Sequence, residues 1–197
     1  MSALKPAIIL VSILLVLAGC SVDSTEEKED SNKEQLPKVD ASKFRKYQGD
    51  GFTIQLLKEM SINTGVVVTL LEADYLPKEY HLEVKAYPNR LVLSEPSCPK
   101  DPKKQLEWFA KTESNSTISK ARNVKAEKLV KTMVDDQPSF KRTINGVNYG
   151  LPKRKTVFLR YYQTKNAFVR IAAWTTSENA EAFEPLAQYM GMTLKIN

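Results

Sequence analysis

An apolar run of thirteen residues opens this chain and limits what its N-terminal segment can become. The run extends from Pro6 to Ala18, is interrupted only by Ser12, and follows a short start with one positive charge, at Lys5. A membrane-spanning helix needs roughly 20 apolar residues, so this run is too short to cross a bilayer. A charged start, a short apolar middle and small residues after it are typical of a secretory signal, here residues 1–19.

The end of this signal, Leu17-Ala18-Gly19-Cys20, resembles a bacterial lipobox. The resemblance implies cleavage between Gly19 and Cys20 and a diacylglycerol on the Cys20 thiol, which makes the mature chain a lipoprotein. Two acyl chains hold a protein at a membrane, whereas one chain binds only weakly at about 0.8 kcal/mol per methylene. The alternatives are an ordinary secretory signal with a coincidental cysteine, or an N-terminal anchor helix.

The lipobox resemblance also implies a location in the cell envelope. In Gram-negative envelopes such proteins usually remain in the inner membrane when Asp follows the cysteine, and here Ser21 follows it. We therefore expect the outer membrane, facing the periplasm, in a Gram-negative cell. In a Gram-positive cell we expect the outer leaflet of the cell membrane.

The next segment, residues 20–42, is polar and acidic. It has no aromatic residue, its larger apolar residues are Val22, Leu36 and Val39, and its net charge is −4. Such a stretch buries too little surface to offset the entropy of ordering it, so we expect a flexible tether. An acidic binding tail is the alternative interpretation.

The remaining residues, 43–197, are numerous enough to form one domain with a proper core. Alternating and β-branched patterns predict strands, and Asn145-Gly146 is typical of a hairpin turn. Residues 91–93 extend the sheet or connect it, and residues 123–134 fit a strand better than a helix. The expected strands cover residues 52–56, 65–71, 80–86, 140–144, 156–163, 167–175 and 192–196.

Two helices are predicted from capping residues and apolar spacing. Asp101-Pro102 starts a helix that we expect to end near Ser114, and Ser177 caps a second helix that Gly191 stops. The fold class expected is therefore α+β, an antiparallel sheet with about two packing helices.

This layout resembles the PsbP-like fold of photosystem II extrinsic proteins and small bacterial lipoproteins. The residues that carry the resemblance are Asp50-Gly51-Phe52-Thr53-Ile54, then Ile144-Asn145-Gly146-Val147 before the tyrosines Tyr161 and Tyr162. A helix from Ser177 and a short last strand complete it. The chain departs from the family after the first strand, at residues 57–60. The resemblance implies binding or assembly roles and supplies no catalytic residue.

We expect no catalytic residue, no metal ligand and no cofactor, because the chain has no hydrolase, zinc-protease or phosphate-loop signature. The only histidine, His81, is expected at a surface or structural position. Cys98 is expected to be an unpaired loop thiol, with a covalent link to another chain as the alternative. Asp135-Asp136 favours a turn over a metal site, and Trp108 and Trp174 favour core or boundary positions.

Positive charge is the unusual feature of residues 43–197, which have 25 basic and 16 acidic residues. Such a surface attracts polyanions, although charge away from zero also serves solubility alone. Possible partners are an envelope protein or an anionic lipid or glycan, and we expect no nucleic acid. The candidate contact residues are Lys120, Arg122, Lys125, Lys128, Lys131, Lys153, Arg154 and Lys155.

Together these features predict a noncatalytic envelope lipoprotein that acts as a binding or assembly module. The runners-up are an envelope enzyme with an unrecognised site, and a small-ligand carrier. A cleft that contains His81 with an acid and a hydroxyl would favour the enzyme. A deep apolar pocket between helix and sheet would favour the carrier.

Replacing the lipidated residue tests the anchor. We expect Cys20→Ser to release the chain from washed membranes into the soluble or secreted fraction, because no acyl chain can then be attached. Fractionation followed by carbonate extraction measures this. A Cys20→Ser chain that still resists carbonate extraction would show that the anchor is not a lipid.

Overall fold

The computed structural model describes residues 33–63, 68–148 and 153–196. The signal, Cys20 and the tether up to residue 32 lie outside the described residues. So do residues 65–67 of the strand expected over residues 65–71. Among the described residues, no helix is both long and apolar enough to cross a membrane.

The main sheet is antiparallel and has eight strands. Their order is β3 (Ser61–Asn63), β4 (Thr69–Tyr75), β5 (Tyr80–Pro88), β10 (Ala167–Thr176), β9 (Arg154–Gln163), β8 (Gln137–Asn148) and β6 (Ala121–Ala126), and β7 (Val130–Val134) also pairs with β8. A smaller sheet joins β1 (Phe44–Gly49), β2 (Phe52–Leu57) and β11 (Lys195–Ile196).

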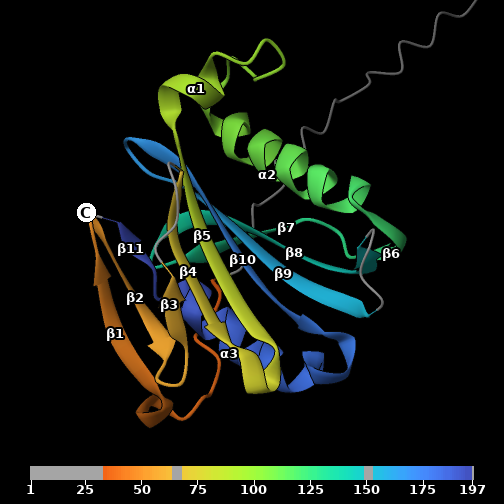
Figure 1. Ribbon diagram of the computed structural model, residues 1–197. Helices are drawn as coiled ribbons and strands as arrows, with labels where there is room; N and C mark the ends of the chain where they lie inside the picture. The colour runs from red at the N-terminus through yellow and green to blue at the C-terminus, as the bar shows by residue number, and fades with distance from the viewer. Residues whose placement is uncertain (1–32, 64–67, 149–152, 197) are drawn as a thin grey trace, which may run out of the picture. The chain divides into compact units, whose positions relative to one another are not determined.

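The two faces of the main sheet are covered by different elements (Figure 1). Helix α2 (Pro102–Ser119) lies on one face, which we call the α2 face. Helix α3 (Ala180–Met192) and the smaller sheet lie on the other, the α3 face. In β10, Phe168 and Ala172 join the core under α2, whereas Val169 and Ile171 join the core under α3. This alternation follows from the two-residue period of a strand, and the α+β prediction is confirmed.

Several expected elements are found at their places. Strands β2, β5, β9 and β10 contain the segments predicted for residues 52–56, 80–86, 156–163 and 167–175. The Asp135-Asp136 turn is also confirmed. It joins β7 to β8, and both aspartates have positive φ angles, 47° and 62°, a conformation that Asp and Asn tolerate better than most residues.

The predicted hairpin turn at Asn145-Gly146 is wrong, because both residues lie inside β8. The Asn145 side chain donates to Thr156 Oγ1 at 2.8 Å and to Ser177 Oγ at 2.7 Å. A Cβ atom on Gly146 would lie 3.2 Å from the side chain of Val124. The glycine is therefore used for close packing against β6 and not for a turn.

The predicted stop of the last helix at Gly191 is also wrong. Helix α3 continues through Gly191 to Met192, and a 3₁₀ turn, η3 (Ser177–Asn179), precedes it. The Gly191 carbonyl accepts a hydrogen bond from the Tyr162 hydroxyl at 2.9 Å. A Cβ atom there would lie 3.6 Å from the Arg160 side chain, an ordinary van der Waals contact, so the packing of α3 against β9 does not require glycine at this position.

Other boundaries differ as well. Residues 123–134 form two strands, β6 and β7, and residues 91–93 belong to a short helix, α1 (Asn89–Leu93). Helix α2 runs five residues past the expected end at Ser114. The expected strand over residues 192–196 is reduced to β11, and β1 and β3 were not predicted. Two further 3₁₀ turns are η1 (Ala41–Lys43) and η2 (Leu76–Lys78).

Residues 33–42, which the composition places in the tether, lie against the domain. Lys33 forms a parallel bridge with Met133, and the Glu34 amide donates to the Met133 carbonyl at 3.1 Å. The Glu34 carboxylate accepts from Arg160 at 2.9 Å and from Lys141 at 2.6 Å. Burial alone would raise the pKa of Glu34, but these two cations outweigh burial and hold that pKa at about 2.

Glu34 should therefore stabilise the fold in a pH-dependent way. We expect Glu34→Gln to lower the free energy of unfolding at pH 7 by about 2 kcal/mol, because Arg160 is buried and keeps its charge. The contribution of an acid with a depressed pKa is complete above about pH 4.5 and is lost as the pH falls toward about 2. Urea unfolding at several pH values measures both effects.

The matched control is Glu95→Gln, which neutralises an exposed acid. The loss caused by Glu34→Gln should shrink below pH 4, whereas the control should change little at any pH. A Glu34→Gln protein as stable as the parent at pH 7 would contradict the role given to this ion pair.

Candidate binding site

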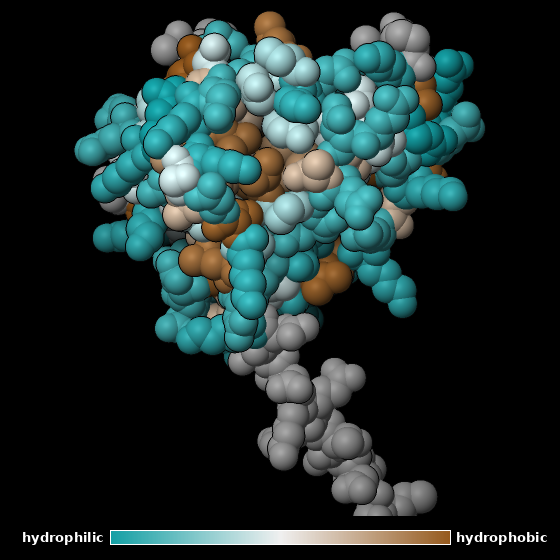
Figure 2. Space-filling model, turned by 90° about the horizontal axis from the view of Figure 1, so that it is seen from below, coloured by the Kyte–Doolittle hydropathy of each residue, from teal (hydrophilic) through white to brown (hydrophobic). Residues whose placement is uncertain are grey.

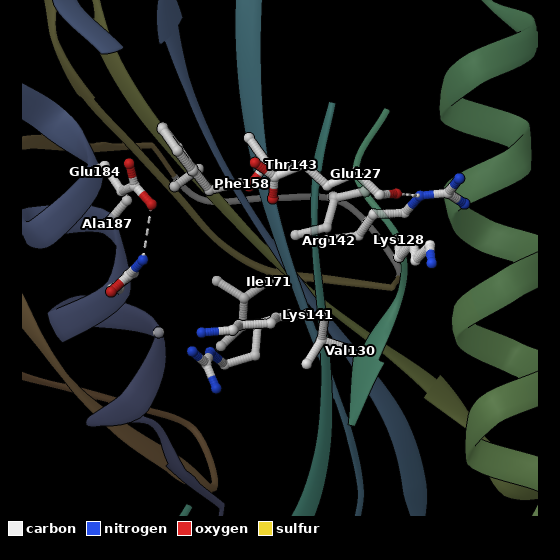
Figure 3. Close-up of a pocket in the computed structure, with 15 residues that line it drawn as sticks. Glu127, Lys128, Val130, Lys141, Arg142, Thr143, Phe158, Ile171, Glu184 and Ala187 are labelled. Carbon is white, nitrogen blue, oxygen red and sulfur yellow. Dashed lines mark hydrogen bonds between the residues drawn. The ribbon is translucent and has the colours of Figure 1, made fainter. Parts of the chain in front are cut away.

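A cleft on the α3 face lies between α3 and the segment that joins β6 to β7 (Figure 3). We call it the α3 cleft. Its floor is formed by apolar side chains of β9 and β10, among them Phe158, Ile171 and Ala173. Its walls are Ala187 and Gly191 of α3 on one side and Val130 on the other. The volume of the cavity is about 100 Å³.

Small residues on α3 explain why the cleft is open. At Ala187 and Gly191 the helix presents a methyl group and a hydrogen atom to the sheet, so α3 approaches closely but does not fill the space beside it. On the opposite wall Val130 is 40 % exposed, which is unusual for a large apolar side chain in a strand. Seen from below, the molecule has hydrophobic surface gathered in a central hollow with hydrophilic residues around it (Figure 2).

The rim of the α3 cleft is charged. Glu184 accepts a hydrogen bond from Gln188 at 3.0 Å on α3. Across the cleft, Lys128 is exposed, whereas the guanidinium of Arg142 points away from the cleft toward α2, where it donates to Ser114 Oγ at 3.0 Å (Figure 3). Arg160 and Lys141 also line the cleft, but their charges are paired with Glu34. The cleft thus combines an apolar floor with a rim of both signs.

The predicted basic contact residues form two groups. Ala121 pairs with Asn148, and Val147 pairs with both Arg122 and Arg154, so β8 brings the basic residues of β6 and β9 to one end of the sheet. Lys131 pairs with Phe140, eight residues from Asn148 along β8, which is roughly 26 Å away. The first group contains Lys120, Arg122, Lys125, Lys153, Arg154 and Lys155, and the second contains Lys128 and Lys131.

The three basic residues at the start of β9 point to different partners. Arg154 donates to Asn145 Oδ1 at 2.5 Å. Lys153 donates to Glu79 at 2.9 Å, which raises the pKa of Lys153 and lowers the pKa of Glu79. Lys155 lies on the α2 face beside Trp174. The exposed cations of the first group are therefore mainly those of β6 and the residue before it.

A second feature was not foreseen from the sequence. His81 Nδ1 lies 2.5 Å from Asp74 Oδ1, and its ring stacks on Trp174 with 5.2 Å between the ring centroids. Asn63 Nδ2 donates to the other Asp74 oxygen at 2.9 Å. Asp74 lies near the end of β4, directly opposite His81 of β5. A strand prediction that continued through Asp74 would have paired this residue with His81, across the turn that joins β4 to β5.

Charged residues also hold α2 to the sheet. Arg170 of β10 pairs with Glu83 of β5 and, at 3.4 Å, with Glu113 of α2. Glu113 also accepts from the Tyr87 hydroxyl at 3.1 Å, and burial raises the pKa of that hydroxyl to about 12. This network is partly buried and joins β5, β10 and α2, so it ties the helix to the sheet.

The remaining candidate residues have structural surroundings. Cys98 is a half-buried free thiol, and burial raises its pKa. Trp108 and Trp174 are partly buried against the core under α2. Within the ranges that the structure covers, no three His, Cys, Asp or Glu side chains gather closely enough to hold a metal ion.

No protein-family model matches this chain, and no curated protein matches it. Solved structures do. The cyanobacterial PsbP protein of Synechocystis is 12 % identical with a TM-score of 0.52, over 83 % of this chain and 98 % of that one. A mutant of the protein Mog1 is 9 % identical with a TM-score of 0.53, over 78 % and 95 %.

A third similar structure is LpqN of Mycobacterium tuberculosis, a protein involved in cell envelope biogenesis. It is 9 % identical with a TM-score of 0.54, over 74 % of this chain and 83 % of that one. At these identities the likeness concerns the fold alone. The predicted resemblance to the PsbP-like fold is thus confirmed as a similarity of architecture to PsbP and Mog1.

Proposed function

We propose that this chain is a noncatalytic binding or assembly module, lipid-anchored in a bacterial cell envelope, and that it binds a partner protein through the α3 cleft. The observation that carries the proposal is the cleft itself, with an apolar floor, a charged rim and a volume of about 100 Å³. Pockets for small-molecule ligands usually measure about 300–1,000 Å³. The α3 cleft instead suits one or two apolar side chains that anchor a protein interface.

The envelope location is supported by two independent features. The lipobox resemblance at residues 17–20 implies an anchor on Cys20, and LpqN, a protein of similar fold, is involved in cell envelope biogenesis. The proposed sites are the outer membrane facing the periplasm, or the outer leaflet of a single cell membrane.

The basic residues of β6 support an additional contact with an anionic lipid, glycan or acidic protein. Arg122 and Lys125 are exposed on a strand at the edge of the sheet, where they attract anions over a distance set by the salt concentration. Lysine and arginine at a sheet edge also prevent unwanted strand pairing. Salt dependence of binding separates these two roles.

The enzyme alternative is favoured by one observation, the Asp74–His81 pair, because such a pair can orient an imidazole as a base. A nucleophile within hydrogen-bond reach would strengthen it. Among the described residues, the side-chain hydrogen bond of His81 is to Asp74 and not to a hydroxyl or thiol. The binding module therefore remains the leading proposal.

Capture from detergent-solubilised envelopes tests the proposal, with residues 31–197 as bait so that Glu34 is kept. We expect Val130→Gln to reduce retention of the partner about tenfold, because an exposed apolar side chain leaves the cleft wall. Retention should persist at high salt. Quantitative mass spectrometry of the bound fraction measures both.

Leu76→Gln is the matched control, since Leu76 is 71 % exposed outside the cleft, and it should retain the partner as the parent does. Equal retention by Val130→Gln and Leu76→Gln would remove the α3 cleft from the interface. Retention of lipid or glycan alone, lost at high salt, would make the basic residues of β6 the functional surface.

A further inference from the structure

Helix α1 carries two exposed leucines. Leu91 is 54 % exposed and Leu93 is 43 % exposed, whereas Val92 between them is buried and packs into the core under α2. Val92 therefore holds α1 to the domain and leaves its two neighbours facing outward. A single exposed leucine on a protein surface needs no explanation. Two in one helix of five residues form an apolar projection that the proposed binding function does not use.

The position of α1 is fixed by a neighbouring turn. The Asn89 amide donates to the Asn166 carbonyl at 2.9 Å, and Asn89 Nδ2 donates to the Lys165 carbonyl at 2.8 Å. These bonds join the end of β5 to the turn between β9 and β10. Figure 1 shows α1 beyond the end of β5, next to the start of α2. We call residues 89–104 and 164–166 together the α1 tip.

Cations accompany the two leucines. The α1 tip has five basic residues and two acidic ones, Glu95 and Asp101. Asp101 accepts from the Lys103 amide at the start of α2 and lies 4.0 Å from the Lys104 ammonium. Over the described part of the chain, the other basic side chains of the tip are exposed and form no ion pair: Arg90, Lys100, Lys103 and Lys165. The tip therefore combines an apolar projection with uncompensated positive charge.

The N-terminal segment reaches the domain at the same end of the sheet. Lys33 bridges to Met133 of β7, which pairs with Pro138 of β8. The next residue of β8, Ser139, pairs with Tyr162, and the β9–β10 turn begins two residues later. From the N-terminal segment to β9 there are three strand spacings, which amount to roughly 15 Å.

A lipid on Cys20 can therefore share a membrane with the α1 tip. Thirteen peptide units separate Cys20 from Lys33, and a chain of this length spans at most roughly 45 Å. This reach exceeds the roughly 15 Å between the N-terminal segment and the β9–β10 turn. The tether thus allows the tip to touch the bilayer that holds the lipid.

Exposed leucines next to cations are the chemistry that an anionic bilayer recognises. Apolar side chains gain free energy when they enter the boundary between headgroups and acyl chains. Lysine and arginine beside them stay at the lipid phosphates, where the surface potential attracts them. A protein partner would have to supply acidic side chains in matching places, whereas the proposed anchor supplies a lipid surface at this end of the domain.

We propose that the α1 tip lies on the anionic membrane surface that holds the Cys20 lipid, with Leu91 and Leu93 inserted at the level of the headgroups. The location rests on the proposed lipid anchor, while the affinity for anionic lipid belongs to the domain itself. In this orientation the membrane meets one end of the main sheet and neither of its faces. The α3 cleft then stays open to a partner.

Vesicle flotation tests the tip without the anchor. The mature chain from residue 20, made with Cys20→Ser so that it carries no acyl chain, is floated with vesicles of phosphatidylglycerol or of phosphatidylcholine. We expect binding to phosphatidylglycerol that weakens with salt, and at least tenfold weaker binding to phosphatidylcholine. The outcome depends neither on acylation of Cys20 nor on the α3 cleft, so failure of the tip and failure of the proposed function are distinguishable.

Variants of the exposed leucines test the insertion. The double variant Leu91→Gln/Leu93→Gln should weaken binding to phosphatidylglycerol vesicles at least tenfold, because less apolar area enters the bilayer. Leu76→Gln is the matched control, since Leu76 is an exposed leucine between β4 and β5, at the opposite end of β5. It should bind as the parent does.

Two charge variants locate the contact. Lys103→Gln/Lys165→Gln removes two positive charges from the tip, and Arg122→Gln/Lys125→Gln removes two from β6. The tip variant should weaken binding more. Melting temperatures check that each variant folds, and if the leucine variant does not, hydrogen exchange of the α1 amides in the vesicle-bound parent replaces it, with protection expected. The proposal is overturned if the parent does not bind phosphatidylglycerol, if the leucine variant binds as the parent does, if the α1 amides gain no protection, or if only the β6 variant loses binding.

Discussion

Two arginines in neighbouring central strands, the buried Arg160 and the half-buried Arg170, tie the covering elements to the main sheet. Arg160 of β9 points to the α3 face and Arg170 of β10 to the α2 face, and each pairs in register with a residue next to the other arginine. Their side chains are 5 % and 15 % exposed. A guanidinium does not lose its charge when buried, so each one requires carboxylates from elsewhere in the chain.

One of those carboxylates, Glu83 beside Arg170, lies on the neighbouring strand β5. The others come from elements that lie outside the strand pairing of the main sheet. Arg160 binds Glu34, which holds the N-terminal segment against β7 and β8. Arg170 binds Glu113, which holds α2 over the sheet. The covering elements are thus tied to the strands by charge as well as by apolar packing, and the hollows lie where those elements end. The α3 cleft lies beside α3, and a hollow lined by His81 and Trp174 lies on the α2 face beyond the area that α2 covers.

The sequence could predict those parts of the fold that follow from local pattern. The strands that became β2, β5, β9 and β10 alternate clearly, and Asp101-Pro102 marks the start of α2, where Asp101 accepts from the Lys103 amide at 3.0 Å. Local pattern failed where glycine and asparagine have long-range partners. Asn145-Gly146 is read as a turn because its side-chain bonds to Thr156 and Ser177 depend on residues 11 and 32 positions away.

The sites were harder to predict, for the same reason. The surplus of positive charge in residues 43–197 was interpreted as one surface that attracts anions. Several of these cations instead form ion pairs with carboxylates within the fold, namely Arg160, Arg170, Lys141 and Lys85. Composition counts these internal cations together with the exposed ones of β6. Net charge therefore sets how strongly the domain attracts anions at long range, while the place of contact depends on which cations the register leaves without a carboxylate. Lys155 is such a residue, and only the pairing of β9 with β10 places it beside Trp174 on the α2 face.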